Sequence, residues 1–526
     1  MSPRTTGISL IGFALLATAF QWLHLQVPVF KIPFLARSTE NSSLFFSIGH
    51  VPFVRLPNSN MIGYLLVAIM LIIGIWLIIR QGREWSLSPL TRKKLQRFRA
   101  ITRGHISFLL LVVLAALATL DNSLVGKRAL MVSYQGRWYF PFIHDVIPGK
   151  TFGQGTDGET DYRELQDKSR TANKGDWVIM PPVPYAASLD SPAVIETLET
   201  RADGKVYTPG GDQPFSGTAY SGFLANPEQK RQEWQFRNGL RHGTLRGWNE
   251  AGVQVEKGRF DNGVRKEYTD FSEGKAAALE AQAAPWLKRF VYPPSAPSWR
   301  HKHFLGTNTN GNDVLAMLFG GWQQALIAAI LYISVVFVVG VLIGGTLGYF
   351  GGWVDLLGYR VIEIWSVLPF LLVVMILSSL TSPSLTMLVG LLAFFGWISS
   401  TSYLRTATYK EVARDYVAAA KLLGASTPRI IIHHVLPNVI AILVTLAPFE
   451  IAGVITSLAA LDFLGFGLPP DQPSWGRLLH EGVENFTYPW MVSSAFTAMA
   501  LVLVLITFVG EAVREAFDPK KFTTYQ

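Results

Sequence analysis

Three short stretches of the 526-residue chain carry residue types that could do chemistry. Gly149-Lys150-Thr151 ends like a phosphate-binding loop, His480-Glu481 begins like the helix of a zinc protease, and Glu450 is an acid within an apolar segment. The first two patterns are incomplete, because His144 replaces the first glycine of the phosphate loop and the zinc pattern lacks its second histidine. The chain has no cysteine, which excludes thiolate metal sites and cysteine nucleophiles. We therefore expect no catalytic residue, cofactor or metal in this chain.

The composition indicates an integral membrane protein. Of all residues, 49% are hydrophobic and only 16% are charged, well below the roughly 25% of soluble domains. The formal net charge is +9, with lysines and arginines clustered beside apolar runs, which favours a bilayer as partner and no nucleic acid. Apolar segments long enough to span are predicted near 7–24, 61–80, 105–120, 324–348, 362–380, 384–403, 439–463 and 490–510.

Two basic stretches orient these predicted spans. The 80–103 stretch and the 405–429 stretch are both rich in arginine and lysine, and positively charged loops stay in the cytoplasm. Alternation then places both termini in the cytoplasm. Residues 1–19 also fit a signal peptide, whose cleavage would not invert the remaining helices. Trp299, Trp397 and Trp475 stand at helix ends or interface-like positions, which favours anchoring at the membrane interface.

The long polar segment 121–322 is predicted to be a folded extracytoplasmic domain. Alternating and aromatic residues in 130–142 predict strands, and 236–252 is weakly repeated in 260–275 with Asn-Gly pairs that suit tight hairpin turns. These repeats resemble MORN-type hairpins in an insert at about 190–290. The insert either enlarges the domain or offers a docking surface for a partner protein.

The stretch RDYVAAAKLLGASTPRIIIHHVLPN (414–438) interrupts the apolar pattern. Asp415 is expected to cap a short helix, Gly424 to end it in a left-handed conformation, and Thr427-Pro428 to start a second helix. Helical spacing predicts that Tyr416, Ala419, Ala420 and Leu423 share one face that a partner surface approaches.

This loop resembles the cytoplasmic loop of permease subunits of binding-protein-dependent ABC importers. Their EAA, Gly and Leu-Pro signature is matched by Ala418-Ala419-Ala420, Gly424 and Leu436-Pro437, with Ala418 in place of the glutamate and His434 in place of an isoleucine. LGTNTNGNDVL (305–315), GYFGGWVD (348–355) and DFLGFGLP (462–469) are similar to segments of the oligopeptide (OppC-like) branch. MVSYQGRWYFPF (131–142), IEIWSVLP (362–369) and VGEAVREAFDP (509–519) are closest to Yej-type permeases of microcin C and peptide importers.

The resemblance covers roughly 95–185 and 295–521, and it implies a fold and a division of the chain. The fold class is an all-α polytopic membrane protein of the type I ABC importer permease fold, with an inserted β-rich extracytoplasmic domain. Residues 1–94 would add about two transmembrane helices and a basic cytoplasmic linker to the family's core. The first core helix would follow at 95–120 and the extracytoplasmic domain at 121–322. Residues 323–526 would form the rest of the core permease domain, with its coupling loop at 405–438.

The resemblance also implies a peptide importer of the bacterial inner membrane. Its partners would be a second permease, ATPase subunits that bind ATP and Mg, and an extracytoplasmic peptide-binding protein. The residues expected to couple to the ATPase are Asp415, Tyr416, Val417, Ala418, Ala419, Ala420, Gly424, Ala425, Ser426, His434, Leu436 and Pro437. Glu450 would either contact a peptide's amino group along the translocation path or be satisfied by a neighbouring helix or subunit.

Two other functional classes compete with this hypothesis. A membrane-anchored envelope interaction or sensor protein would use the outer domain for binding, but it would not need so many helices or this loop. A self-sufficient secondary transporter would show paired inverted repeats, and no clear pair is present.

Overall fold

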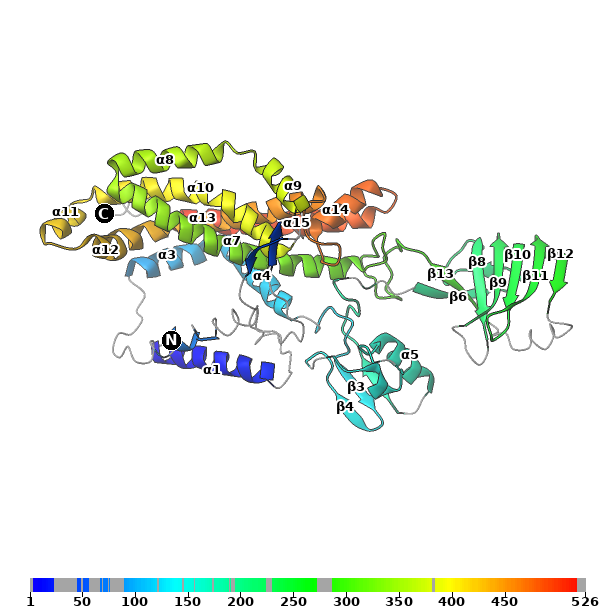
Figure 1. The fold of residues 1–526 in the computed structure, drawn as a ribbon. Helices are drawn as coiled ribbons and strands as arrows, with labels where there is room; N and C mark the ends of the chain where they lie inside the picture. Colours follow the sequence, from blue (N-terminus) through cyan, green and yellow to red (C-terminus); the bar gives the residue numbers. More distant parts are fainter. Residues whose placement is uncertain are drawn as a thin grey trace. The chain divides into compact units, whose positions relative to one another are not determined.

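The computed structural model describes residues 3–22, 45–48, 51–55, 67–68, 70–73, 75 and 89–517, except 121–122, 144–145, 156, 173–174, 189, 191–193, 224–228, 272–285 and 381–383. The chain divides into two compact units (Figure 1). The first contains residues 1–190, 296–308 and 312–526, and the second contains residues 191–295 and 309–311. Each unit is described by itself below.

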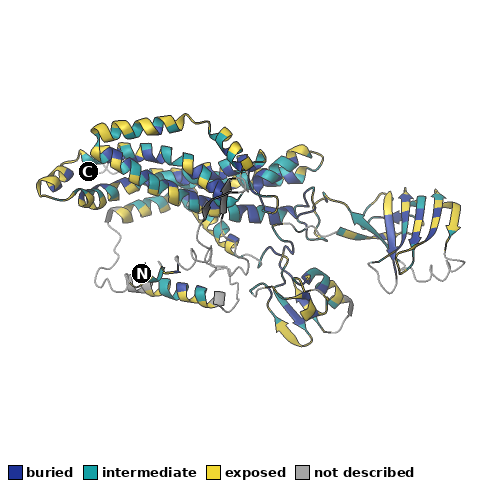
Figure 2. Cartoon of the chain, in the orientation of Figure 1, coloured by how far each residue is buried: buried dark blue, intermediate teal, exposed yellow. Residues whose placement is uncertain are grey.

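The first unit contains a bundle of long apolar helices. Among the described residues, five helices are long and apolar enough to cross a membrane, and a bent pair brings the total to as many as six. The five are α4 (Thr102–Thr119), α7 (Val314–Phe350), α10 (Leu385–Val412), the continuous helix Thr427–Phe463 that includes α13 (Leu436–Phe463), and α15 (Pro489–Phe517). Exposed residues alternate with buried ones along these helices, as expected where lipid covers the outer face (Figure 2).

Two of the predicted spans differ from the helices found. The segment predicted as one span at 362–380 is a pair, α8 (Gly352–Ser366) and α9 (Phe370–Leu380), bent by 69°. Pro369 stands in the break, where its ring and missing N–H prevent a continuous helix. The span predicted at 324–348 begins earlier, at Val314, because the carboxylate of Asp313 accepts the Ala316 N–H at 2.7 Å and caps α7.

The first two predicted spans precede this bundle. The stretch predicted at 7–24 lies in helix α1 (Pro3–Trp22), whose apolar part, Ile8–Ala19, is shorter than the other spans. The span predicted at 61–80 falls largely outside the described residues. A short hairpin of β1 (Phe45–Ile48) and β2 (Val51–Arg55) and the basic helix α3 (Pro89–Ala100) complete this part of the chain.

Helices α7 and α10 pack through glycines spaced four apart, Gly340, Gly344 and Gly348. A Cβ on Gly344 would lie 2.6 Å from the Thr401 carbonyl oxygen, and one on Gly348 would lie 2.5 Å from the Arg405 carbonyl oxygen. Within a bilayer such small residues let helix backbones approach closely and gain dispersion contacts. Helices α7 and α10 are therefore a closely packed pair.

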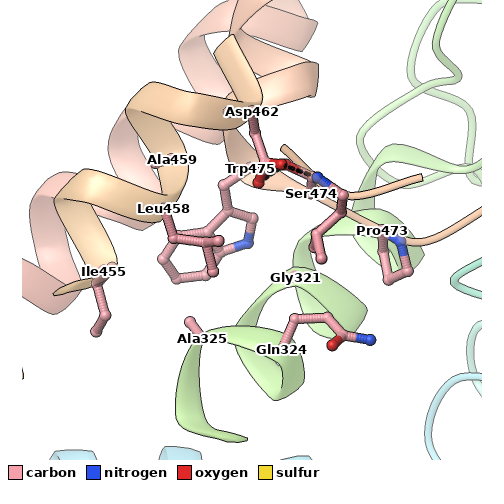
Figure 3. A pocket seen from close by; sticks show the side chains of 12 residues that line it. Gly321, Gln324, Ala325, Ile455, Leu458, Ala459, Asp462, Pro473, Ser474 and Trp475 are labelled. Atoms are coloured by element: carbon pink, nitrogen blue, oxygen red, sulfur yellow. Dashed lines mark hydrogen bonds between the residues drawn. The ribbon is translucent and has the colours of Figure 1, made fainter. Parts of the chain in front are cut away.

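The C-terminal end of α13 is tied to helix α14 (Trp475–Glu484) by a buried carboxylate (Figure 3). Asp462 accepts hydrogen bonds from the Ser474 hydroxyl and the Leu468 N–H, both at 2.5 Å. Trp475 is buried, donates its indole N–H to the Leu318 carbonyl at 2.8 Å, and lines a small cavity of about 20 Å³, enough for one water molecule. The prediction of an interface anchor at Trp475 is therefore wrong, because a helix crossing covers its ring.

A small lobe lies between α4 and the second unit in sequence. Its three-stranded sheet has the order β4-β3-β5 and consists of β3 (Met131–Tyr134), β4 (Arg137–Tyr139) and β5 (Trp177–Ile179), with the turn Gly149–Phe152 (η2) and helix α5 (Tyr162–Ala172). Val132, Phe152, Tyr162, Leu165 and Val178 form its core. The strands predicted in 130–142 are β3 and β4.

The second unit is an eight-stranded sheet with strand order β12-β11-β10-β9-β8-β13-β6-β7. Its strands are β6 (Val194–Thr200), β7 (Val206–Tyr207), β8 (Gly217–Gly222), β9 (Lys230–Arg237), β10 (Leu240–Trp248), β11 (Gln254–Asp261), β12 (Val264–Asp270) and β13 (Leu287–Val291). The predicted tight turns are confirmed, because Asn238-Gly239 and Asn262-Gly263 connect β9 to β10 and β11 to β12 with positive φ at all four residues.

Candidate functional site

The predicted coupling loop connects α10 to α13 through two short helices. Helix α11 (Asp415–Leu422) is followed by α12 (Thr427–Ile430) and by a π-helical turn, Ile431–Val435 (η3), that leads into α13. Asp415 does not cap α11 as predicted. The extended residue Arg414 occupies the cap position, and Asp415 is the first helical residue, where its negative charge suits the helix N-terminus.

Gly424 ends α11 as the sequence predicts. Its φ is +78°, its N–H bonds the Lys421 carbonyl, and the N–H of Ala425 bonds the Ala420 carbonyl, each at 3.0 Å. This pair of bonds is a Schellman motif, whose left-handed residue is most favourable as glycine. The turn reverses the chain, so α11 projects from the end of the bundle, as Figure 1 shows.

The inner face of α11 packs on the helix bundle. Val417 and Ala420 are the buried residues of α11, and they pack with Ile430 and Val435 against Leu404 of α10 and neighbouring residues of α13. Of the four residues predicted to share a face, only Ala420 is buried. The side predicted to face a partner is therefore exposed at Tyr416, Ala419 and Leu423, whereas Ala420 packs on the bundle. A sequence does not show which side of a short helix has a neighbour.

Two leucines dominate the outer surface of the loop. The side chains of Leu422 and Leu423 are 89% and 88% exposed, although both are large and apolar. Leu422 was not among the predicted site residues, and Leu423 was expected on the partner-facing side with Ala420. The other predicted residues with exposed positions are Asp415, Tyr416, Ala418, Ala419, Gly424, Ser426 and Pro437, whereas Ala425, His434 and Leu436 are half-buried.

Tyr416 joins the loop to both flanking spans. Its hydroxyl donates to the Glu411 carboxylate of α10 at 2.6 Å and accepts from the Asn438 amide of α13 at 2.9 Å. Asn438 also donates to Glu411 at 3.2 Å and to the His434 carbonyl at 3.2 Å. Partial burial and the bond to Glu411 raise the pKa of Tyr416, so the hydroxyl keeps its proton at neutral pH. We call Glu411, Tyr416 and Asn438 the polar triangle.

A second polar link lies between α8 and α10, beside the loop. Arg405 donates through two guanidinium nitrogens to the Asp355 carboxylate, and it also lies over the Tyr359 ring at 4.6 Å. Bidentate pairing of this kind fixes orientation as well as distance. The sequence analysis predicted neither the contacts of the polar triangle nor the pairing of Arg405 with Asp355. Charged residues in apolar helices were the available signal.

Glu450 lies half-buried in α13, opposite Tyr332 of α7. The Tyr332 hydroxyl donates to its carboxylate at 3.3 Å, so the acid has a partner on a neighbouring helix. A Cβ at Gly396 of α10 would lie 2.1 Å from the same hydroxyl, which places three spans around this contact. The contact with a peptide's amino group stays a prediction.

The stretches that resemble nucleotide and zinc sites have ordinary structural roles. Gly149–Phe152 is a short 3-10 turn, the described residues directly after it form no helix, and Lys150 pairs with Asp157 at 2.6 Å. His480 lies 3.4 Å from Glu484, one helical turn away. Among the described residues, no group of three or more metal-binding side chains occurs.

Comparison with known proteins gives a consistent result. Residues 340–523 match the family described as "Binding-protein-dependent transport system inner membrane component". The chain is similar to the inner membrane ABC transporter permease protein YejE of Escherichia coli K12, with 31% identity over 435 residues, 83% of this chain and 98% of that protein. It is 29% identical over 446 residues to the peptidoglycan transport system permease protein YejE of Agrobacterium fabrum, covering 84% and 96% of the two chains. It is 35% identical over 221 residues to the oligopeptide transport system permease protein OppC of Mycobacterium tuberculosis H37Rv, covering 41% and 76%.

Proposed function

The chain belongs to the inner-membrane permease family of binding-protein-dependent ABC transporters, and from this premise we propose that it forms part of the pore through which an importer moves peptides. The names of its relatives concern oligopeptide and peptidoglycan transport, and both cargoes contain peptide bonds. Oligopeptides, or peptide-containing molecules such as microcin C, are the cargo that these likenesses support. The permease is not itself an ATPase.

The complete importer in this proposal contains four kinds of subunit. A second permease completes the pore, two ATPase subunits bind ATP and Mg, and an extracytoplasmic protein delivers the peptide. The helices of this chain adopt the type I importer permease fold, with the coupling loop and both termini in the cytoplasm. The basic residues of α3 and of the loop support this orientation, because both groups would then meet the cytoplasmic side.

The observation that carries the proposal is the contrast between the two sides of the coupling loop. Val417 and Ala420 hold α11 on the helix bundle, while Leu422 and Leu423 project from it with almost no contacts. Apolar side chains so exposed on a compact helical projection suit insertion into a groove on a partner. The partner that fits is the ATPase subunit.

The polar triangle gives this contact a mechanical route into the membrane. When ATP draws the two ATPase subunits together, the docked α11 moves with them. Tyr416 then transfers the displacement to α10 through Glu411 and to α13 through Asn438, because both bonds are short and directional. The spans rearrange, the pore opens to the loaded binding protein, and hydrolysis resets it.

The first experiment purifies the tagged full-length protein in mild detergent, identifies the proteins that accompany it, and measures vanadate-sensitive ATPase activity. A second permease and an ATPase should accompany the wild type. Gly424→Trp should lose that activity while still inserting in the membrane, because only glycine adopts φ of +78° at low cost. A stable wild-type protein with neither partner, or full activity in Gly424→Trp, would overturn the proposal.

A further inference from the structure

The small lobe has one face on which two tryptophans and an isoleucine are exposed. In its sheet Ser133 of β3 pairs with Trp138 of the neighbouring strand β4 and with Trp177 of the other neighbouring strand, β5. Met131 of β3 pairs with Ile179 of β5. Paired residues project from the same face of a sheet, so these five side chains share one surface, which we call the aromatic face. The opposite face carries Val132 and Val178, which belong to the core packed by α5.

The aromatic face is exposed and preformed. Trp138 is 65% exposed, Trp177 is 37% exposed and Ile179 is 48% exposed. The two indole rings contact each other edge to face, with centroids 6.4 Å apart, and they cover the small Ser133 side chain between them. Phe140, two residues beyond Trp138, is also exposed. An apolar patch of this kind, on a folded lobe, indicates a surface that meets a partner.

The lobe is fixed beside the outer ends of two membrane spans. It begins within a few residues of the end of α4 at Thr119, and Val125 packs against Ala316 in the first turn of α7. Tyr185 of the lobe stacks on His303 with ring centroids 4.0 Å apart, and His303 contacts the α7 cap residue Asp313 at 2.8 Å. These contacts hold the lobe beside the N-terminal end of α7.

The segment just before α7 contains residue types that are common at membrane interfaces. Trp299 is 84% exposed, and its neighbour Arg300 is exposed as well. Tryptophan beside a basic residue is common where a chain meets lipid headgroups, because the indole ring prefers the boundary and the cation meets phosphate. Trp299 packs on Phe304, which joins the same cluster as Val125 and Ala316. An exposed tryptophan and an exposed arginine therefore lie next to the cluster that joins the lobe to α7.

We propose that the aromatic face rests on the bilayer, with Trp138, Trp177 and Ile179 inserted at the headgroup level of the leaflet next to the α4 end and the α7 start. Under the orientation proposed above this is the outer leaflet. A lipid surface fits better than a protein groove, because tryptophan is the residue that membrane interfaces select and the lobe itself packs through Val125 on the first turn of α7. The contact would hold the lobe in one position beside the pore entrance.

The natural absence of cysteine makes the test direct. Ile179→Cys places a fluorescent label on the aromatic face and leaves both tryptophans intact. Arg170→Cys places the same label on the exposed side of α5, as the matched control. The full-length proteins are reconstituted in nanodiscs of phosphatidylethanolamine and phosphatidylglycerol, with and without nitroxide-labelled phospholipid. The label at Ile179 should lose most of its fluorescence to the nitroxide lipid, and the label at Arg170 should lose little.

Variants of the two tryptophans separate anchoring from mere proximity. Trp138→Ser with Trp177→Ser should abolish most of the quenching at Ile179, while Trp138→Tyr, which keeps an interfacial ring, should retain it. Equal quenching at the two label positions, or full quenching after both serine substitutions, would overturn the proposal. A label at Ile179 that ignores nitroxide lipid but responds to the purified peptide-binding protein would overturn it in favour of a protein-docking surface. None of these outcomes depends on ATPase coupling, so the proposed function is tested separately.

Discussion

The two exposed leucines of the coupling loop allow a quantitative test. Leu422→Ala and Leu423→Ala each remove three carbon groups from a side chain that is almost fully exposed in the isolated chain. The fold of the permease should hardly change, because surface substitutions of this kind stay within about 0.5 kcal/mol. If the ATPase groove buries each side chain, the loss is about 0.8 kcal/mol per carbon group, or about 2.4 kcal/mol per leucine. That corresponds to an affinity for the ATPase about 60-fold weaker.

The assay measures binding of the purified ATPase subunit to the permease in nanodiscs by biolayer interferometry, together with thermal unfolding of each permease variant. Leu464→Ala is the control, because Leu464 is 49% exposed at the opposite end of α13, away from the loop. An unchanged affinity in both loop variants would refute the assignment of these leucines as the docking residues. A lower unfolding temperature would instead show that they support the fold.

Four further predictions follow from single contacts. Tyr416→Phe removes the hydroxyl of the polar triangle and leaves the leucines in place, so ATPase binding should persist while transport per ATP hydrolysed falls; an unchanged ratio would contradict the route described above. Gly344→Ala should lower thermal stability in detergent by about 1–3 kcal/mol, because the new Cβ meets a carbonyl oxygen of α10 at 2.6 Å, whereas Gly345→Ala, with no described atom within 4 Å of its Cβ, should be neutral. Glu450→Gln should change peptide selectivity in uptake competition if the carboxylate meets a peptide amine, and unchanged selectivity would leave it a purely structural acid bound to α7. In the small lobe the Glu159 carboxylate pairs with Lys127 at 2.7 Å and with Arg128 at 2.6 Å. Burial raises the pKa of Glu159, but these two cations lower it more, so its pKa lies below the ordinary 4.5. The pair's stabilisation of the lobe is full above pH 4.5 and lost as pH falls through the lowered pKa, so hydrogen exchange should show less acid dependence in Glu159→Gln.

Several structural features were predictable because their cause is local. The turn at Gly424 follows from a glycine after a short helix, and the hairpin turns follow from Asn-Gly pairs, since both depend on the φ values that individual residues accept. The later spans follow from the length of their apolar runs. The bend at Pro369 was also within reach, because proline limits the helix before it.

The inner face of α11 shows where local reasoning ends. Helical spacing gives sets of residues that share a face, but the chain has several such sets on one short helix. Which set is buried depends on where α10 and α13 lie, because Val417 and Ala420 pack with Leu404 of α10 and Val439 of α13, residues that are separated from α11 along the chain. The exposure of Leu422 and Leu423 is a consequence of that packing.

The sequence by itself determined that this chain spans a membrane several times, because hydropathy and charge are properties of the order of residues, and the permease assignment came from the resemblance of its motifs to a known family. Tertiary structure alone decided the polar triangle, the partner of Glu450 and the aromatic face. Glu411 meets Asn438, Tyr332 meets Glu450 and Trp138 meets Trp177 across 27, 118 and 39 positions of the chain. Contacts at such separations exist only after helices and strands have packed, because packing then brings side chains from distant segments within a few ångströms of one another.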